Sequence, residues 1–570
     1  MADQHEGLSN GKSVNEETLP SPKDTNNVLE NIDEPNLPKW QLLCLGISLS
    51  FGLFLSLLDT TIVATALYTI GVDFNTLNAV NWVALAYTLS YLGCVVLFAR
   101  MADIIGRRDA YISAFVIFFA FSLGCGFAQS LNQLIICRVF QGIGGSGLYS
   151  LTMVIIPEIC TLSMRKWIGA AIGAIVAMSG ILGPLLGGII THYTTWRWIF
   201  WINAPVGIIP LILFFVAWPK ADHMRHAERL PLRDLDFVGS VLLIAASVLV
   251  VFSFQNAGIR SDVWSSTIFI VPLVIGTFGW IMLFGWEVLA DRYWHRLLTM
   301  FPLRLIRNRV YSTAVISTML TGYSYFVVIY SLPLRLQVVH GRSPLAAGVA
   351  LLPMLGSTAI GSVIGGRVSG RKNRTFPTLL AGSCFMALGT GLLSTLGNTA
   401  SVQAKMYGFL VFAGLGFGLT LSTSSMLSTM ECELRDHAVA QGIVAQCRIL
   451  GGSIGIAAST ATLGVMQRKR LSGIVGESQL ASLSHSSHST LSDDQLNAVH
   501  QVYSDAFSRD MIVCTIISSV CILVTLGTFQ KHPLSVEEKR SQQVARERDR
   551  IRKRNEVAVD SVESKESGGP

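Results

Sequence analysis

The sequence predicts an all-α polytopic membrane protein with fourteen spans and both termini in the cytoplasm. Composition is the first reason: charged residues make up 14% of the 570 residues and apolar residues 51%, whereas a soluble protein carries about 25% charge. The second reason is that the apolar residues lie in uninterrupted blocks, each close to the roughly 20 residues that cross a bilayer. Because lipid offers no partner for backbone polar groups, these blocks must be helices.

The apolar blocks follow one another along the whole chain, separated by short polar loops. They occupy residues 41–67, 81–99, 110–128, 133–156, 168–190, 198–218, 237–255, 267–288, 310–332, 344–365, 376–397, 404–428, 441–463 and 510–530.

The charges between the blocks orient the protein. Cytoplasmic loops of membrane proteins carry an excess of Lys and Arg. With the N-terminus inside, the inner loops hold more than twice as many Lys and Arg residues as the outer loops. We therefore expect both termini on the cytoplasmic side.

Four segments outside the blocks have distinct compositions. Residues 1–38 are polar and are expected to be a disordered cytoplasmic tail. Residues 464–508 form the long outer loop, which is polar and of low complexity. Residues 531–570 are a charged cytoplasmic tail, in which 539–554 is expected to be a solvated helix near anionic lipid. The linker 292–309 mixes basic and apolar residues and is expected to lie on the inner membrane surface.

A weak internal repeat divides the chain. Residues 98–115 and 365–382 each end a span, carry a basic cluster and enter the next span. The match predicts two halves of six spans, 39–218 and 310–530, joined by a segment, 219–309, that contains two inserted spans. In transporters built from repeated halves, the substrate site lies between the halves near mid-membrane.

Several classes of function find no support in the sequence. The ten cysteines lie mostly inside apolar blocks, which argues against a disulfide framework. We find no metal-type Cys/His spacing, no P-loop and no nucleophile elbow, so we expect no metal, no cofactor and no enzymatic activity. The net charge of +7 is spread over many short loops, unlike the basic patch of a nucleic-acid-binding protein.

Two features of the spans are costly and therefore informative. Asp59 is an acid deep in the first span, and a carboxylate at membrane depth is a functional candidate by default. The stretch GILGPLLGG places four glycines and a proline in the fifth span. Close backbone packing drives helix association in lipid, so this stretch predicts a smooth, tightly packed helix face that includes Gly180, Gly183, Pro184, Gly187 and Gly188.

Seven motifs, taken together and in this order, resemble the major facilitator superfamily, and within it the fourteen-span drug:proton antiporters. The resemblance covers about residues 40–530. The motifs are LDTTIVATAL (58–67), ARMADIIGRR (99–108), RVFQGIGGSG (138–147), GILGPLLGG (180–188), WRWIFWINAPVG (196–207), LPLRLQVVHGRSPLAAGVALLP (332–353) and RILGGSIGIA (448–457). Two positions depart from the family pattern: Ala99 replaces a glycine, and Ile104 stands where a basic residue is common.

The resemblance implies a coupling site between the first and fourth spans, which line the cavity of a half in this fold. Asp59 lies about 26 Å above the inner end of its span, and Arg138 about 8 Å below the outer end of its own. The two are expected to pair, directly or through water, and to take and release a proton. Gln141 and Gly142 would support Arg138 by hydrogen bonding and close approach. A static pair that joins two helices is the alternative.

The resemblance also assigns roles to other motif residues. Asp103, Gly106, Arg107 and Arg108 form a cytoplasmic gating loop, expected to latch the helix ends of the two halves in the outward-facing state. Ordinary inner-loop charge explains Arg107 and Arg108, but not Asp103. The glycine-rich stretch of the fifth span would seal the path between the halves. Arg448, in the thirteenth span, is a possible cavity residue of the second half that contacts substrate or a lipid phosphate.

The resemblance therefore predicts proton-coupled export of small, mostly apolar or amphipathic organic compounds, such as drugs or a fungal toxin, by alternating access. The expected partners are the export substrate, protons and membrane lipids. We expect a monomer in the plasma membrane, with the vacuolar membrane as the alternative. A carrier of siderophores or basic amino acids is the rival function, and a membrane sensor that transports nothing is a more distant one.

Overall fold

The computed structural model describes residues 37–74, 80–160, 162–219, 234–257, 266–294, 297, 299–397, 402–433, 436–471, 474, 492–536, 538–546, 549 and 552. Within these ranges the regular structure is helical. Fourteen segments are helical, long and apolar enough to cross a membrane, which confirms the predicted number of spans.

Spans of the first half come before residue 219. They are α2 (Lys39–Asp73), α3 (Asn81–Ile105), α4 (Arg107–Phe127), α5 (Leu131–Ile159), α6 (Leu162–Tyr193) and the pair α7 (Trp198–Trp201) and α8 (Asn203–Ala217).

The inserted spans and the second half follow. The inserted spans are α9 (Phe237–Ala257) and α10 (Thr267–Tyr293), and the short α11 (Leu303–Ile306) leads into the second half. The second half comprises α12 (Arg309–His340), α13 (Pro344–Val349) with α14 (Leu352–Lys372), α15 (Thr375–Leu393), α16 (Lys405–Met430), α17 (His437–Leu471) and α19 (Asp493–Thr525), which ends in the 3₁₀ turn η5 (Leu526–Thr528).

Local sequence signals explain several helix ends. Gly106 separates α3 from α4 with φ of 96°, a backbone conformation that glycine adopts at little cost. The Asn308 side chain accepts hydrogen bonds from the first backbone N–H groups of α12. Ser492 and Gln495 form a capping box that begins α19.

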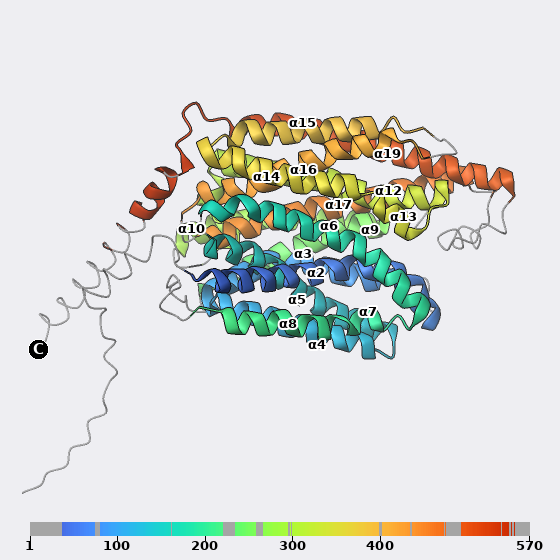
Figure 1. Cartoon of the computed structure of the whole chain (residues 1–570), viewed down its shortest axis with the longest axis horizontal. Coiled ribbons are helices and arrows are strands. Elements are labelled where there is room, and N and C mark those ends of the chain that lie inside the picture. The colour runs from blue at the N-terminus through green and yellow to red at the C-terminus, as the bar shows by residue number, and fades with distance from the viewer. Residues whose placement is uncertain are drawn as a thin grey trace, which may run out of the picture.

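The two halves lie side by side as helix bundles of similar length (Figure 1). α6 of the first half packs along α14 of the second, and α3 and α5 pack against α17. One buried apolar cluster contains side chains from both halves, including Tyr149 of α5 and Tyr325 of α12. The core therefore continues across the boundary between the halves.

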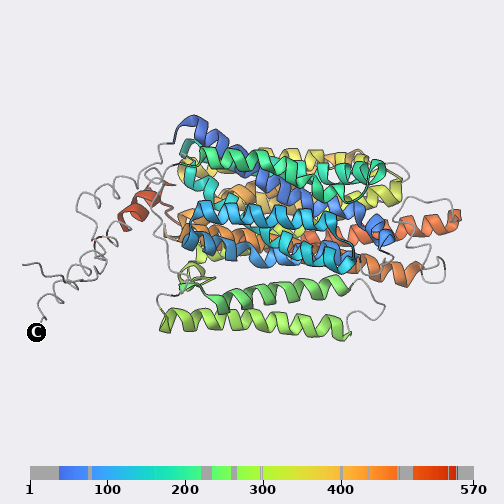
Figure 2. The same ribbon diagram turned by 90° about the horizontal axis from the view of Figure 1, so that it is seen from below.

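The inserted pair α9 and α10 runs along one face of this bundle (Figure 2). α9 contacts α3 of the first half and α17 of the second, while α10 packs mainly on α9. The outer face of α10 exposes large apolar side chains such as Phe278 and Ile281, as expected of a helix that faces lipid. The insertion therefore covers the seam between the halves.

Helices α17 and α19 correct the expected outer loop. We expected a loop over 464–508, but α17 continues to Leu471 and α19 begins at Asp493. A basic cluster lies in the last turn of α17, and Arg470 forms an ion pair with Asp505 of α19. The low-complexity residues 475–491 lie outside the described residues.

The linker and the C-terminal tail both contact the helix bundle. Met300, Phe301 and Leu305 of the linker, which was expected on the inner membrane surface, are buried against the protein. In the tail, Lys539 forms an ion pair with Glu431, and the Gln543 side chain donates to carbonyl oxygens at the end of α16. This part of the tail is therefore docked on the protein. The N-terminal tail lies outside the described residues, except for 37 and 38.

Candidate functional site

The predicted pair of Asp59 and Arg138 lies in direct contact between α2 and α5. The Asp59 side chain is fully buried and that of Arg138 is 1% exposed. Asp59 Oδ2 forms an ion pair with Arg138, and Asp59 Oδ1 accepts hydrogen bonds from Gln141 Nε2 at 3.0 Å and Asn203 Nδ2 at 3.3 Å. Both oxygens of the buried carboxylate therefore have partners.

Arg138 is held from several directions. Its Nε donates to the Val83 carbonyl oxygen at 3.0 Å, and its Nη1 donates to Gln141 Oε1 at 2.9 Å. The guanidinium carbon lies 4.1 Å from the ring centroid of Tyr87 on α3. The planar guanidinium of arginine can make these contacts at the same time, whereas the single ammonium group of lysine cannot.

Gly142 permits the close approach of α5 to α3 at this site. A Cβ atom added at Gly142 would lie 3.1 Å from the Tyr87 Cα and closer still to its carbonyl oxygen. Four elements thus meet at the carboxylate, α2, α3, α5 and α8, and Gln141 and Gly142 lie where the motif predicted support for Arg138.

Asn203 and Tyr87 are members of this site that the sequence reasoning missed. Asn203 is 1% exposed and also donates to Ser122 Oγ at 3.0 Å, so one amide links α8, α4 and the carboxylate. Its signal in the sequence is an amide inside an apolar span, within the motif WRWIFWINAPVG. Tyr87 gave no such signal, because tyrosines are common along the spans.

A ladder of three tyrosines continues inward from Arg138. The ring of Tyr87 lies 5.7 Å from that of Tyr91, which lies 5.9 Å from Tyr149 on α5. Tyr149 then accepts a hydrogen bond at 3.4 Å from Arg448 Nη1 on α17. Arg448, the candidate residue of the second half, is thereby connected to the Asp59–Arg138 pair through aromatic side chains.

The glycine-rich stretch lies on α6, next to both α2 and α14. A Cβ atom at Gly183 would lie 2.6 Å from Thr61 Cβ, whereas Gly180 and Gly188 face open space. The Thr61 hydroxyl donates to the Ser179 carbonyl oxygen at 3.0 Å. Gly187 is buried, and the side chain of Pro184 lies outside the described residues. Within the motif, Gly183 thus packs against Thr61, which lies two residues from Asp59 on α2.

The charged loop between α3 and α4 is tied mainly within the first half. Asp103 Oδ1 lies 2.6 Å from Arg107 Nη1, and Arg107 Nη2 lies 3.2 Å from Glu158 Oε1 on α5. Arg108 lies over the ring of Phe215 on α8 at 5.6 Å. Arg100, near the end of α3, donates to the Thr299 carbonyl oxygen of the linker, outside this half.

Four buried acids among the described residues were not predicted as site residues: Asp236, Glu287, Asp436 and Asp510. Asp510 of α19 is 6% exposed and accepts a hydrogen bond from Ser459 of α17. Glu287 of α10 is fully buried and accepts from the Phe301 backbone N–H at 2.8 Å. Glu287 therefore holds the linker against the inserted pair.

Comparisons with known proteins agree on the family. The model of the Major Facilitator Superfamily matches residues 49–456. The MFS-type transporter FPY5 of Fusarium mangiferae is 32% identical over 87% of this chain and 84% of its own length. The efflux pump roqT of Penicillium rubens is 29% identical over 78% of this chain and 82% of its own.

The solved structures show the same fold. A bacterial homologue of the human lysosomal transporter Spinster, inward-facing and occupied, superposes with a TM-score of 0.51 at 15% identity. The match covers 86% of this chain and 98% of that chain. With its fourteen helical spans, the chain belongs to the Major Facilitator Superfamily and is a membrane transporter of small molecules rather than an enzyme.

Proposed function

We propose that this transporter exports small organic compounds, drugs or a toxic metabolite, in exchange for protons across the plasma membrane. The observation that carries the proposal is the buried contact between Asp59 and Arg138. A carboxylate at membrane depth is costly. Arg138 shares the Asp59 carboxylate with the amide donors Gln141 and Asn203. When Arg138 and Asp59 separate, the carboxylate can take up a proton. The similarity to an efflux pump supports the outward direction.

The exchange would run by alternating access. When the cavity opens outward, Asp59 takes a proton, which weakens its attraction to Arg138 and frees the arginine and the tyrosines beside it. Reorientation then exposes the carboxylate to the inner side, where proton release restores the pair and accompanies substrate binding. Protons entering down their gradient thereby drive export, as expected for a chain without an ATP-binding motif.

The test is export from cells preloaded with a panel of dyes and toxins, at equal surface expression, with and without a protonophore. We expect wild-type export to collapse with the protonophore and Asp59→Asn to abolish it. The matched control is Asp73→Asn, on the same helix. The hydrogen bond from Trp196 and the neighbouring Arg197 lower the pKa of Asp73, whose side chain is 46% exposed at the outer end.

Two outcomes would count against this function. Wild-type export that persists without a proton gradient would favour exchange or another coupling ion. Equal loss of export in Asp73→Asn and Asp59→Asn would show a general sensitivity of α2 to neutralisation, and would remove Asp59 from the coupling path.

A further inference from the structure

Arg448 is a buried cation at the boundary between the halves. It lies eleven residues into α17, about 16 Å from its inner end at 1.5 Å per residue, and is 4% exposed. Its one described hydrogen bond crosses to the first half, where Nη1 donates to the Tyr149 hydroxyl at 3.4 Å. Nη2 is buried and has no hydrogen-bond acceptor among the described residues.

Among the described buried arginines of the spans, Arg100 pairs with Asp103 and Arg138 with Asp59, whereas Arg335 and Arg448 have no described ion pair. Arg335 of α12 donates to the carbonyl oxygens of Leu396 and Gly397. In the part of the chain that the structure describes, no carboxylate lies within ion-pair distance of Arg448. An uncompensated buried charge is strongly unfavourable, so this guanidinium has capacity for an anion from outside the protein.

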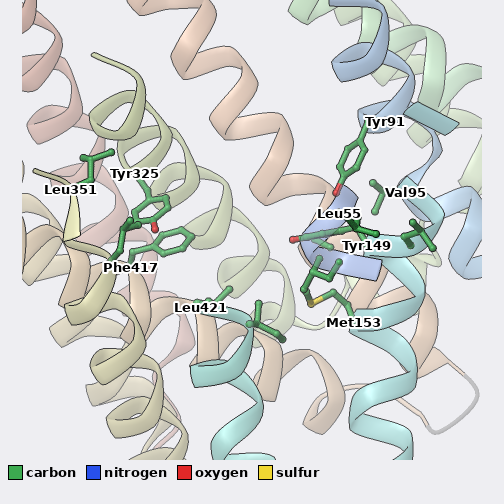
Figure 3. Close-up of a cluster of buried hydrophobic side chains, with 14 of the residues drawn as sticks. Leu55, Tyr91, Val95, Tyr149, Met153, Tyr325, Leu351, Phe417 and Leu421 are labelled. Atoms are coloured by element: carbon green, nitrogen blue, oxygen red, sulfur yellow. The ribbon is translucent and has the colours of Figure 1, made fainter. Parts of the chain in front are cut away.

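The surroundings of Arg448 suit an aromatic or apolar body. Tyr149 is the immediate neighbour, with Tyr91 behind it. The same buried cluster contains Tyr325 of α12, stacked on Phe417 of α16 with ring centroids 3.6 Å apart. Figure 3 shows these aromatic side chains on two sides of one region, with Met153 beside Tyr149 and Leu421 on the side of Phe417. The Tyr325 hydroxyl is also buried without a described partner.

We propose that the export substrate is an organic anion, whose carboxylate or phenolate pairs with Arg448 and whose apolar body packs on the tyrosines. This inference rests on the proposed export function and names its substrate class. Binding of the anion replaces the contact between Arg448 and Tyr149 that joins the halves. Because Tyr149 connects through Tyr91 and Tyr87 to Arg138, substrate binding and the coupling pair act on the same side chains.

The experiment compares two dyes that share a xanthene body but differ in charge, fluorescein as the anion and rhodamine 123 as the cation. Full-length protein in phosphatidylcholine vesicles transports each dye under a proton gradient. We expect the wild type to transport fluorescein faster than rhodamine 123, and Arg448→Gln to lower the ratio of fluorescein to rhodamine 123 transport by about tenfold, the effect of one charge-assisted hydrogen bond. Arg448→Lys should retain part of the fluorescein transport, because it keeps the charge.

Arg335→Gln is the matched control, since it removes a buried arginine of the same half that already has acceptors. It should leave the ratio of the two transport rates unchanged. Vesicles that also contain phosphatidylglycerol test a lipid source for the anion. A requirement of both dyes for that lipid would assign Arg448 to a lipid phosphate and overturn the proposal.

The remaining outcomes separate the inference from the proposed function. Transport of rhodamine 123 without fluorescein would preserve proton-driven export and refute the anionic substrate. Equal loss of transport of both dyes in Arg448→Gln would show that Arg448 holds the two halves together and does not contact substrate. Transport of neither dye by the wild type would overturn export itself, and the substrate class with it.

Discussion

At the scale of single residues, the Asp59 site shows how a charge is kept inside a membrane. Its carboxylate accepts from Arg138, Gln141 and Asn203. Removing one partner of a buried ion pair typically costs about 3–5 kcal/mol, because the other charge remains unpaired. Such a pair persists only where the surrounding donors hold both members.

Replacing Arg138 by Lys tests whether charge alone is sufficient. Lysine keeps the charge but cannot reach Asp59, the Val83 carbonyl and Gln141 from one ammonium group while stacking on Tyr87. We expect dye export to fall by about tenfold or more, since at least one charge-assisted hydrogen bond is lost. The measurement is proton-driven export at equal surface expression. Arg197→Lys, at the half-exposed pair with Asp73, is the control and should export normally. If Arg138→Lys exported at the wild-type rate, the guanidinium geometry of Arg138 would not be required.

At the scale of helices, the sequence predicted the spans well because lipid enforces apolar composition along their whole length. It predicted their ends less well, because α17 and α19 continue into polar residues beyond the membrane. Asp510 therefore looked like the first residue of a span, although it lies in the middle of α19. The tyrosine ladder was also hidden, since aromatic residues are as frequent toward lipid as toward the interior. Only Asp59 and Arg138 carried a charge signal strong enough to mark the site.

The start of α9 shows how the inserted pair is fixed to the bundle. The Asp236 carboxylate accepts from the Gly239 backbone N–H at 2.7 Å and from Trp286 Nε1 of α10 at 2.9 Å. Its Oδ2 is buried with no described hydrogen bond. Burial raises the pKa of Asp236 above its ordinary value of 3.8, although these hydrogen bonds oppose the shift. The residue thus caps α9 while burial disfavours the charged form of its carboxylate.

This arrangement predicts opposite effects of two substitutions at Asp236. Asp236→Ala removes the cap and should destabilise the protein by about 1 kcal/mol, whereas Asp236→Asn keeps the accepting oxygen and should be neutral or stabilising at neutral pH. Because the native pKa is raised, the native state binds the proton more readily than the unfolded state. Wild-type stability should therefore rise as the pH falls from the native pKa towards 3.8.

Thermal unfolding of the purified protein in detergent, measured across that range of pH, checks this prediction. Asp236→Asn has no carboxyl group to titrate at this position, so it should lack this pH dependence of stability. The difference between its melting temperature and that of the wild type should therefore shrink as the pH falls. A difference that is constant with pH, or that grows at low pH, would show that Asp236 is not held by burial in the way the structure indicates.

At the scale of the whole molecule, the two halves pack closely where α17 begins. Gly442 near the start of α17 packs on Val96 and Ala99 of α3. An apolar cluster joins α3, the inserted helices, the linker and α17 there. Arg304 of the linker adds an ion pair with Asp436, at 2.7 Å between Nε and Oδ2. Alternating access requires these contacts to separate in each transport cycle, so the inner closure is the place to test the motion.

A cysteine pair at Ala99 and Gly442 should lock the transporter. A Cβ atom at Gly442 would lie 3.1 Å from the Ala99 Cβ, so a small shift brings the pair to the roughly 3.5–4.5 Å that a disulfide needs. We expect oxidation of the double variant to reduce dye transport in vesicles to the level of empty vesicles, and a reductant to restore it. Each single cysteine variant, treated with the same oxidant, controls for the ten native cysteines and should remain active. Normal transport by fully cross-linked protein would mean that the inner ends of α3 and α17 stay together throughout the cycle, and that substrate reaches Arg448 by another route.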